Sequence, residues 1–264
     1  MMRLLFILFT LLVVSNSFAQ RIVSLVPSVT QTLQQLGADS KVVARTSMCP
    51  TAQNGKTVVV GDVLTVNVEQ IVAMSPTAII TMGFTRPEVI KKLKHLKLNV
   101  VELQTPSTFE EMCEQTLLLG KLADCEQDAR HYISEQKKKL QEFENHKNKG
   151  YKYFFQVGTK PLWGASPKMY LTDLIQKIGG TNIVNFGNGS VSREYVVASN
   201  PNVIVMTTMG GLWKEEKEVW RKLCKNAIVI VVDEDVAGCP TPQNFCTTIE
   251  KIFVNDEYNK LINR

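Results

Sequence analysis

The side chains best suited to catalysis gather near the end of the chain. Asp233, Glu234 and Asp235 follow an apolar run, and Cys239 comes shortly after them. A nucleophilic thiol or carboxylate of this kind works with a base beside it, usually a histidine. All three histidines lie instead in lysine-containing stretches typical of exposed helices: His95, His131 and His146. We therefore expect no catalysis, and the alternative is an exported enzyme that uses Asp233, Asp235 or Cys239.

Motifs for bound nucleotides and metals are absent from the sequence. It contains neither Gly-x-Gly-x-x-Gly nor a phosphate loop ending in Gly-Lys-Ser/Thr, the patterns with which backbone amides hold phosphate groups. His-Glu-x-x-His and Gly-x-Ser-x-Gly are missing as well. No pair of cysteines has the close spacing of a zinc site. We expect no resident cofactor and no metal.

The loops expected at strand ends are rich in aromatic and turn-forming residues. Trp163 and Trp213 stand beside glycines in expected loops and offer apolar area for a large ligand, although core packing explains a tryptophan equally well. Ligands of open α/β sheets bind at the carboxyl ends of the strands. The residues predicted to contact a ligand are Pro27, Ser28, Met48, Cys49, Asp62, Phe84, Trp163, Phe186, Trp213 and Pro240.

Two glutamates occupy matching places in the two halves of the chain. A segment beginning at Glu69 aligns without gaps with one beginning at Glu194. Each predicts a short helix that starts near a capping residue, Asn67 or Ser192, and ends before a proline. A carboxylate in the first turn is favoured by the helix dipole. Its recurrence supports a second interpretation, in which one acidic group per lobe docks on basic residues of a two-fold partner.

The elements that must position these residues alternate between strands and helices, which predicts parallel βα units. The predicted strands span residues 22–26, 42–45, 57–60, 78–82, 100–103, 151–157, 203–207 and 228–232. The predicted helices span residues 29–36, 87–96, 126–147, 168–178 and 245–253.

One long helix is expected in the middle of the chain. Residues 126–147 contain no glycine or proline, and their few apolar side chains keep helical spacing. The predicted fold is therefore α/β, with two Rossmann-like lobes joined by one long helix and a ligand cleft between them. The expected organisation is a signal peptide at 1–19, an N-terminal α/β lobe at 20–124, a connecting helix at 125–149 and a C-terminal α/β lobe at 150–264.

The N-terminus has the order of a secretory signal peptide. Arg3 precedes an apolar run from Leu4 to Val14, and small residues end at Ala19. The run is too short to span a bilayer, which takes on the order of 20 residues. We expect cleavage after Ala19 and a periplasmic location, with no lipid attachment because no cysteine follows closely.

Net charge and cysteine content limit the kinds of partner molecule and covalent cross-link that we expect. The formal net charge of +5 comes largely from lysines in the long charged helix, and no basic and aromatic residues interleave as nucleic-acid binding requires. An oxidising compartment makes disulfides among the six cysteines possible, without indicating their pairing. We expect a monomer that does not bind nucleic acid.

Four segments resemble the cobalamin- and iron-siderophore-binding proteins of ABC importers, whose lobes are joined by a single backbone helix. They are residues 21–28, 67–76, 178–182 and 191–194. The resemblance covers most of the chain after the leader. It implies a ligand held between the lobes, a connecting helix that permits modest lobe movement, and one glutamate per lobe that meets arginines of the permease dimer. Those glutamates match Glu69 and Glu194.

The resemblance also bears on the ligand. Residues 191–194 look most like the cobalamin-binding branch, so cobalamin or a related corrinoid is favoured, delivered to a permease dimer with its ATPase. Residues 47–50 lack an aromatic seen in many cobalamin binders, and residues 62–64 have no tryptophan. Haem or a ferric siderophore is the alternative ligand. A sensor or scavenger without a permease is the alternative role.

Overall fold

The computed structural model describes residues 20–52, 56–62, 65–83, 85–144, 150–208 and 211–262. The first half of the chain forms a parallel sheet of strand order β3-β2-β1-β4-β5. Its strands are β1 (Ile22–Ser24), β2 (Val42–Arg45), β3 (Val58–Val59), β4 (Ala78–Met82) and β5 (Val100–Leu103). All five were predicted from their β-branched runs, with ends that differ by up to two residues.

The second half forms a sheet of order β10-β9-β6-β7, with β8 paired to β6. Its strands are β6 (Lys152–Thr159), β7 (Leu162–Gly164), β8 (Thr181–Asn182), β9 (Val203–Thr207) and β10 (Ile228–Val232). Only β7 runs antiparallel to its neighbour. The sequence did not predict β7 and β8, because strands this short have no detectable period.

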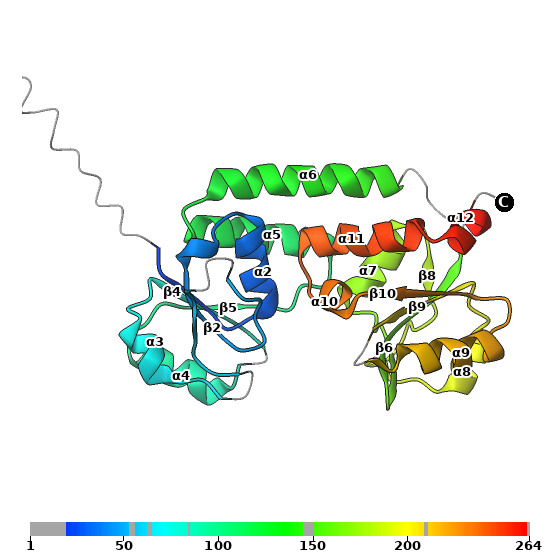
Figure 1. Ribbon diagram of the computed structural model, residues 1–264, viewed down its shortest axis with the longest axis horizontal. Helices are drawn as coiled ribbons and strands as arrows, with labels where there is room; N and C mark the ends of the chain where they lie inside the picture. Colours follow the sequence, from blue (N-terminus) through cyan, green and yellow to red (C-terminus); the bar gives the residue numbers. More distant parts are fainter. Residues whose placement is uncertain are drawn as a thin grey trace, which may run out of the picture.

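Helices flank both sheets (Figure 1). Those of the first half are α2 (Pro27–Gln35), α3 (Val68–Ala73), α4 (Pro87–His95) and α5 (Phe109–Leu122), and α6 (Glu126–Glu144) follows them. Those of the second half are α7 (Tyr170–Lys177), α8 (Arg193–Ser199), α9 (Trp213–Leu223), α10 (Glu234–Ala237), α11 (Pro242–Phe253) and α12 (Asp256–Ile262). The structure therefore has the predicted α/β architecture of two lobes and a long helix.

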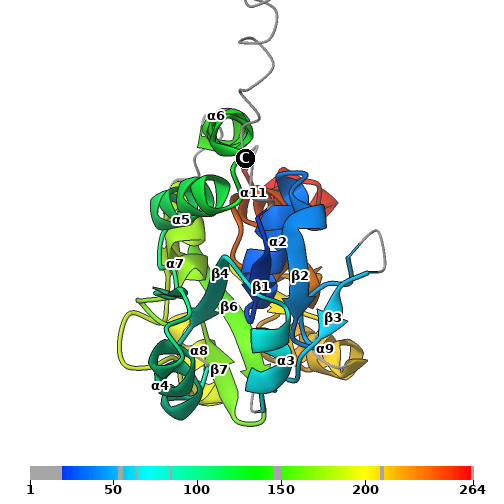
Figure 2. The ribbon, with the colours of Figure 1, turned by 90° about the vertical axis from the view of Figure 1, so that its left-hand side faces the viewer.

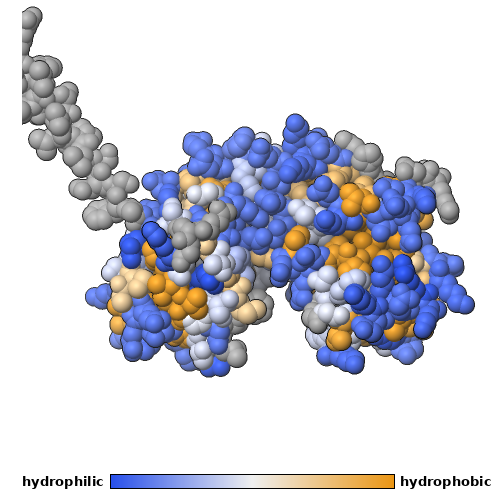
Figure 3. Space-filling view, viewed as in Figure 1, coloured by the Kyte–Doolittle hydropathy of each residue, from blue (hydrophilic) through white to orange (hydrophobic). Residues whose placement is uncertain are grey.

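The long helix α6 lies across the top of the molecule, over α5 and α11 (Figures 1 and 2). Its buried residues Ala129, Tyr132, Gln136 and Leu140 form one stripe, as the sparse apolar pattern predicted. The outer side of this layer is hydrophilic (Figure 3). Residues 145–147 of the predicted helix lie outside the described residues.

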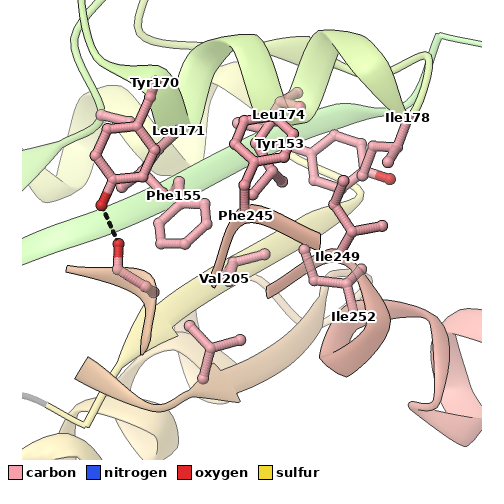
Figure 4. Close-up of a cluster of buried hydrophobic side chains, with 14 of the residues drawn as sticks. Tyr153, Phe155, Tyr170, Leu171, Leu174, Ile178, Val205, Phe245, Ile249 and Ile252 are labelled. Atoms are coloured by element: carbon pink, nitrogen blue, oxygen red, sulfur yellow. Dashed lines mark hydrogen bonds between the residues drawn. The ribbon is translucent and has the colours of Figure 1, made fainter. Parts of the chain in front are cut away.

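Helix α5 belongs to the first half of the chain and still completes the core of the second lobe. Phe109, Met112 and Cys113 are buried in one cluster with side chains of β6, β9 and α11. The rings of Phe109 and Phe245 lie 5.1 Å apart, and Figure 4 shows Phe245 among Phe155, Val205 and Ile249. Since full burial of one such side chain is worth about 1.5–3 kcal/mol, this shared core holds the lobes together.

Polar contacts fix the same junction. The backbone N–H of Phe109, at the first turn of α5, donates to Asp173 Oδ2 of α7 at 2.9 Å. Lys177 Nζ of α7 lies 2.6 Å from Glu110 Oε1 of α5. The first N–H groups of a helix have no partners within the helix. Asp173 of the second lobe therefore supplies a hydrogen-bond acceptor for the first turn of α5, which belongs to the first half of the chain.

The six cysteines are free thiols in the structure. Burial raises the pKa of the Cys113 and Cys246 thiols to about 12, so both stay protonated at neutral pH. Within the described ranges, no helix combines the length and apolar composition that a bilayer crossing requires.

Removing the carboxylate of Asp173 tests the junction. We expect Asp173→Ala to lower the free energy of unfolding by about 1 kcal/mol, the typical value of a lost helix cap, in urea denaturation. Asp173→Asn keeps an acceptor and serves as the matched control. An alanine variant as stable as the wild type would contradict the contact.

The same residue predicts a pH dependence. Burial raises the pKa of Asp173 above its ordinary value, so its contribution to stability is full below the unfolded-state pKa of about 3.9 and declines as pH rises through the folded-state pKa. The stability of the wild type relative to Asp173→Asn should therefore fall between pH 3 and pH 7. Parallel unfolding curves of both proteins across that range measure it.

Candidate functional site

A cleft of about 540 Å³ lies between the two lobes, and Figure 3 shows the molecule hollowed there, on the side opposite α6. Most of its lining comes from strand ends and the loops that follow them. The lining residues are Leu25, Val26, Pro27, Ser28, Met48, Met82, Thr85, Thr105, Val157, Met169, Tyr170, Leu171, Thr207, Glu234, Ala237, Gly238, Cys239 and Pro240. The site thus has the position expected for ligands of open α/β sheets.

The lining is apolar and rich in sulfur. Met48, Met82 and Met169 line the cleft together with Cys239. Burial raises the pKa of the Cys239 thiol to about 12, so this group is neutral at pH 7. Flexible methionines suit a large, irregular apolar ligand.

Hydroxyl groups supply most of the polar chemistry of the cleft. Ser28, Thr85, Thr105 and Thr207 stand among its lining residues, each with a donor and acceptor. The Tyr170 hydroxyl is already engaged, because it donates to the carbonyl of Ala237. Among the described lining residues, the carboxylate of Glu234 is the one charged group.

A second hollow of about 680 Å³ adjoins the cleft over the β6–β7 hairpin. It shares Val157, Met169 and Glu234 with the cleft and adds Trp163 and Lys160. A ligand larger than the cleft itself has room to extend over the indole of Trp163.

The structure brings together half of the residues predicted to contact ligand. Pro27, Ser28, Met48 and Pro240 line the cleft, and Trp163 lines the adjoining hollow. Met48 is 64% exposed at the rim. Trp163 belongs to strand β7 instead of the expected loop.

Two predicted contacts serve local structure instead. Cys49 is buried, with its Sγ 3.1 Å from Thr46 Oγ1. Asp62 accepts hydrogen bonds from the backbone N–H and the hydroxyl of Thr65, at 2.6 and 3.0 Å. Neither residue is among those that line the cleft or the adjoining hollow. Both sit in loops after strands, where sequence position alone does not tell a turn-forming side chain from a ligand contact.

Two of the predicted aromatic residues lie outside the lining of the cleft. Trp213 is the first residue of α9 and packs against the buried cluster around Trp220, because an indole half-covered by its own lobe is more stable than one in solvent. Phe186 rests edge-on against Tyr195, with ring centroids 5.2 Å apart. Neither lines the cleft. Phe84 lies outside the described residues.

Several lining residues were missed by sequence reasoning. Met82 and Thr207 are the last residues of strands that the sequence did predict, so the rule on strand ends was sufficient to find them. Met169 precedes α7 at its N-cap, a position that no motif marks.

In the acidic run at residues 233–235, one residue caps a helix and another lines the cleft. Asp233 caps α10 by accepting from the N–H of Asp235 at 2.9 Å, and Glu234 lines the cleft. In the part of the chain that the structure describes, no cluster of three or more His, Cys, Asp or Glu side chains forms a metal site.

The matched glutamates lie in the first turns of two short helices. Asn67 Oδ1 caps α3 by accepting from Gln70 N at 3.0 Å, and Ser192 Oγ caps α8 by accepting from Tyr195 N at 3.2 Å. Glu69 and Glu194 are exposed. Hydrogen bonds from its own backbone N–H and from Ser192 lower the pKa of Glu194, so its charge is retained at neutral pH. Both helices lie away from α6 (Figures 1 and 2).

A buried polar network anchors α8 to the second sheet. Arg193 Nη2 donates to Glu216 Oε2 at 2.7 Å, and Gln156 Nε2 donates to Glu216 Oε1 at 3.1 Å. Trp220 Nε1 donates to Gln156 Oε1 at 2.6 Å. Since Gln156 precedes the cleft residue Val157 on β6, the network ties the helix of Glu194 to the wall of the cleft.

The profile of the periplasmic binding protein family matches residues 22–229. The chain belongs to this family. It is 24% identical over 260 residues to the vitamin B12-binding protein of Vibrio parahaemolyticus, covering 92% of this chain and 91% of the relative. It is 26% identical to the uncharacterized ABC transporter substrate-binding lipoprotein YvrC of Bacillus subtilis, covering 85% and 76%.

Solved structures of periplasmic binding proteins share the fold. The vitamin B12 binding protein BtuF of Vibrio cholerae matches with a TM-score of 0.77 at 22% identity, covering 93% of this chain and 98% of that one. The haem binding protein HutB of the same species matches with a TM-score of 0.76 at 17% identity, covering 92% and 99%. Proteins that bind different ligands are thus about equally close in fold to the periplasmic binding protein described here.

Breaking the anchor of α8 tests its energetic role. Glu216 is 5% exposed, whereas the Arg193 side chain is 32% exposed. We expect Glu216→Ala to lower the free energy of unfolding by about 2 kcal/mol, below the range for a fully buried pair, in urea denaturation followed by tryptophan fluorescence. Glu216→Gln keeps the side-chain volume and one acceptor oxygen but replaces the other with an amide donor, so it should lose about half as much. Equal losses would assign the effect to the charge and acceptors of the carboxylate, and a loss for alanine alone would assign it to packing.

Proposed function

We propose that this periplasmic binding protein captures cobalamin or a related corrinoid in the interlobe cleft and delivers it to an ABC permease dimer with its ATPase. Family membership supports a role in solute transport. The choice of ligand rests on one observation, the absence of lysine and arginine among the described residues that line the cleft.

The charge of the lining separates the candidate ligands. Haem carries two carboxylates, and catecholate complexes of ferric iron are anionic, so both gain from cationic side chains and are repelled by Glu234. A corrin ring presents a broad apolar face edged by neutral amides, which methionines can cover and hydroxyls can bind. The cleft matches the second kind of ligand better, because burying an unpaired charge is costly.

Haem or a ferric siderophore is the second candidate. Lys160 stands in the adjoining hollow, where it can pair with one carboxylate of a ligand that extends over Trp163. The resemblance in fold to a haem binding protein is compatible with this alternative.

The remaining parts of the proposal follow from the same role. The chain acts without catalysis and without a resident cofactor, as a monomer in the periplasm after cleavage behind Ala19. Glu69 and Glu194 meet basic residues of the permease, one from each lobe. The exposed position of both carboxylates, in helices on the side away from α6, supports that contact.

Equilibrium binding tests the ligand. Ligand-free refolded protein should bind cyanocobalamin and cobinamide one-to-one in calorimetry, with matching changes in visible spectra. Binding of haem or a ferric siderophore with silence toward both corrinoids would reject the corrinoid and leave capture and delivery in place.

Shortening Met48 tests the cleft. A side chain that is 64% exposed in the free protein becomes covered by ligand, and losing about half of its apolar burial is worth about 1.4 kcal/mol. We expect Met48→Ser to weaken cyanocobalamin binding about tenfold without changing the thermal midpoint. Val254→Ser, at an equally exposed position after α11, is the control and should bind as the wild type does.

Removing both acidic groups tests delivery. Glu69→Ala combined with Glu194→Ala should leave ligand affinity unchanged and abolish stimulation of the ATPase in proteoliposomes. Glu88→Ala, in the first turn of the neighbouring α4, is the matched control. A double variant that stimulates the ATPase normally would rule out the proposed contact.

A further inference from the structure

The two helices that carry Glu69 and Glu194 each expose a valine one turn further on. Val72 is 43% exposed and Val197 is 39% exposed. The residues directly before them, Ile71 and Val196, are fully buried. Since residues three apart share one face of a helix, each valine lies beside its glutamate on the outer surface.

We propose that Val72, Val197 and Phe186 form the apolar part of the contact with the permease dimer. The inference rests on the proposed role of Glu69 and Glu194 and adds a second kind of interaction to it. The partner is a two-fold protein that offers an apolar patch next to a cationic group, twice.

Phe186 enlarges the apolar surface of the second lobe. Its side chain is 47% exposed and meets Tyr195 of α8 at 89° between the rings. Tyr195 is held in turn, because its hydroxyl donates to the carbonyl of Ile183 at 2.6 Å. Phe186 therefore has a fixed place beside the residue that follows Glu194.

The surface of the first lobe is hollowed next to Glu69. A hollow of about 520 Å³ adjoins α3 and is lined by Val66, Val68, Glu69 and Lys92, among others. It gives a side chain of the partner room to reach the carboxylate of Glu69 from the side. Charge and apolar surface are thus adjacent on both lobes.

Two exposed carboxylates contribute too little binding free energy to hold a partner without apolar neighbours. An exposed ion pair contributes little net free energy and weakens with salt, so two of them orient a complex without holding it. Burying the exposed part of each valine adds affinity in proportion to the apolar area removed from water. Apolar residues in the centre of an interface commonly carry its affinity, while charges set its register.

The repeated glutamate–valine pair favours contact with a two-fold partner protein over contact with the ligand. The offset from glutamate to valine is the same in both lobes, as a partner made of two equal halves requires. Both helices lie on the same side of the molecule, away from α6 (Figures 1 and 2). None of the three apolar residues is among those that line the cleft.

The test compares serine and alanine variants in one docking assay. The permease–ATPase complex that the proposed function requires is placed in lipid nanodiscs, and binding of the chain is measured between 50 and 500 mM NaCl. The variants are Val72→Ser with Val197→Ser, Phe186→Ser alone, and Glu69→Ala with Glu194→Ala. Val254→Ser is the control, and threonine at both valine positions keeps the branched shape if serine lowers the thermal midpoint.

The expected result separates the two interactions. The valine variant should dock at least tenfold more weakly with an unchanged salt dependence, and Phe186→Ser should weaken docking with cyanocobalamin binding intact. The glutamate variant should lose most of the salt dependence.

Each other outcome overturns the inference. Valine variants that dock like the wild type refute it and leave the proposed function standing, whereas a wild type that does not bind the complex refutes both. Weaker ligand binding by Phe186→Ser would assign that residue to the cleft. Loss of a dimer in sedimentation, with docking unchanged, would assign the surface to a second copy of this chain.

Discussion

The fixed relation between the two lobes depends on the apolar core that α5 shares with the second lobe. Phe109, Met112 and Cys113 come from the first half of the chain and are buried among residues of the second. Separating the lobes would expose these side chains together with Phe245. Since each such exposure costs about 1.5–3 kcal/mol, wide hinge opening is far less favourable than small adjustments about the α5–α6–α11 layer.

A fixed relation between the lobes preforms the cleft and fixes the spacing of α3 and α8. Neutral hydrogen bonds tie α2 of the first lobe to the connecting helix and to the second lobe, from Tyr132 of α6 to Gln35 at 2.7 Å and from Asn244 of α11 to Gln31 at 3.1 Å. They satisfy buried amides, which would otherwise be costly. Ligand and partner therefore meet surfaces that are already in place, and less of their binding energy is spent on ordering the protein. The ion pair between the partly exposed Arg193 and the buried Glu216 extends this rigidity to α8.

The sequence predicted the fold better than the site. Eight strands and the connecting helix follow from β-branched runs and helical spacing, because burial on a sheet or helix repeats with a fixed period. Strands β7 and β8 were not predicted because they are short, and helices α5, α9, α10 and α12 were missed as well. In the site, Pro27 and Met48 follow from strand order, whereas Trp213 and Phe186 do not line the cleft. An aromatic in a loop has the same composition whether it faces a ligand, its own lobe or a partner, and only the packing decides.

The sequence similarity between the segments that begin at Glu69 and Glu194 distinguishes the surface of α3 and α8 from the lining of the cleft. It is strongest at the caps, the glutamates and the valines of α3 and α8, and in the buried strands β4 and β9 that follow. It fades beyond these strands, where Met82 and Thr207 open into loops of different sequence around the cleft. A single ligand without two-fold symmetry touches a different surface on each lobe, so the cleft gains nothing from repetition. A partner with two equal halves requires matching residues on both lobes. The chain has such matching residues on α3 and α8 and lacks them in the cleft.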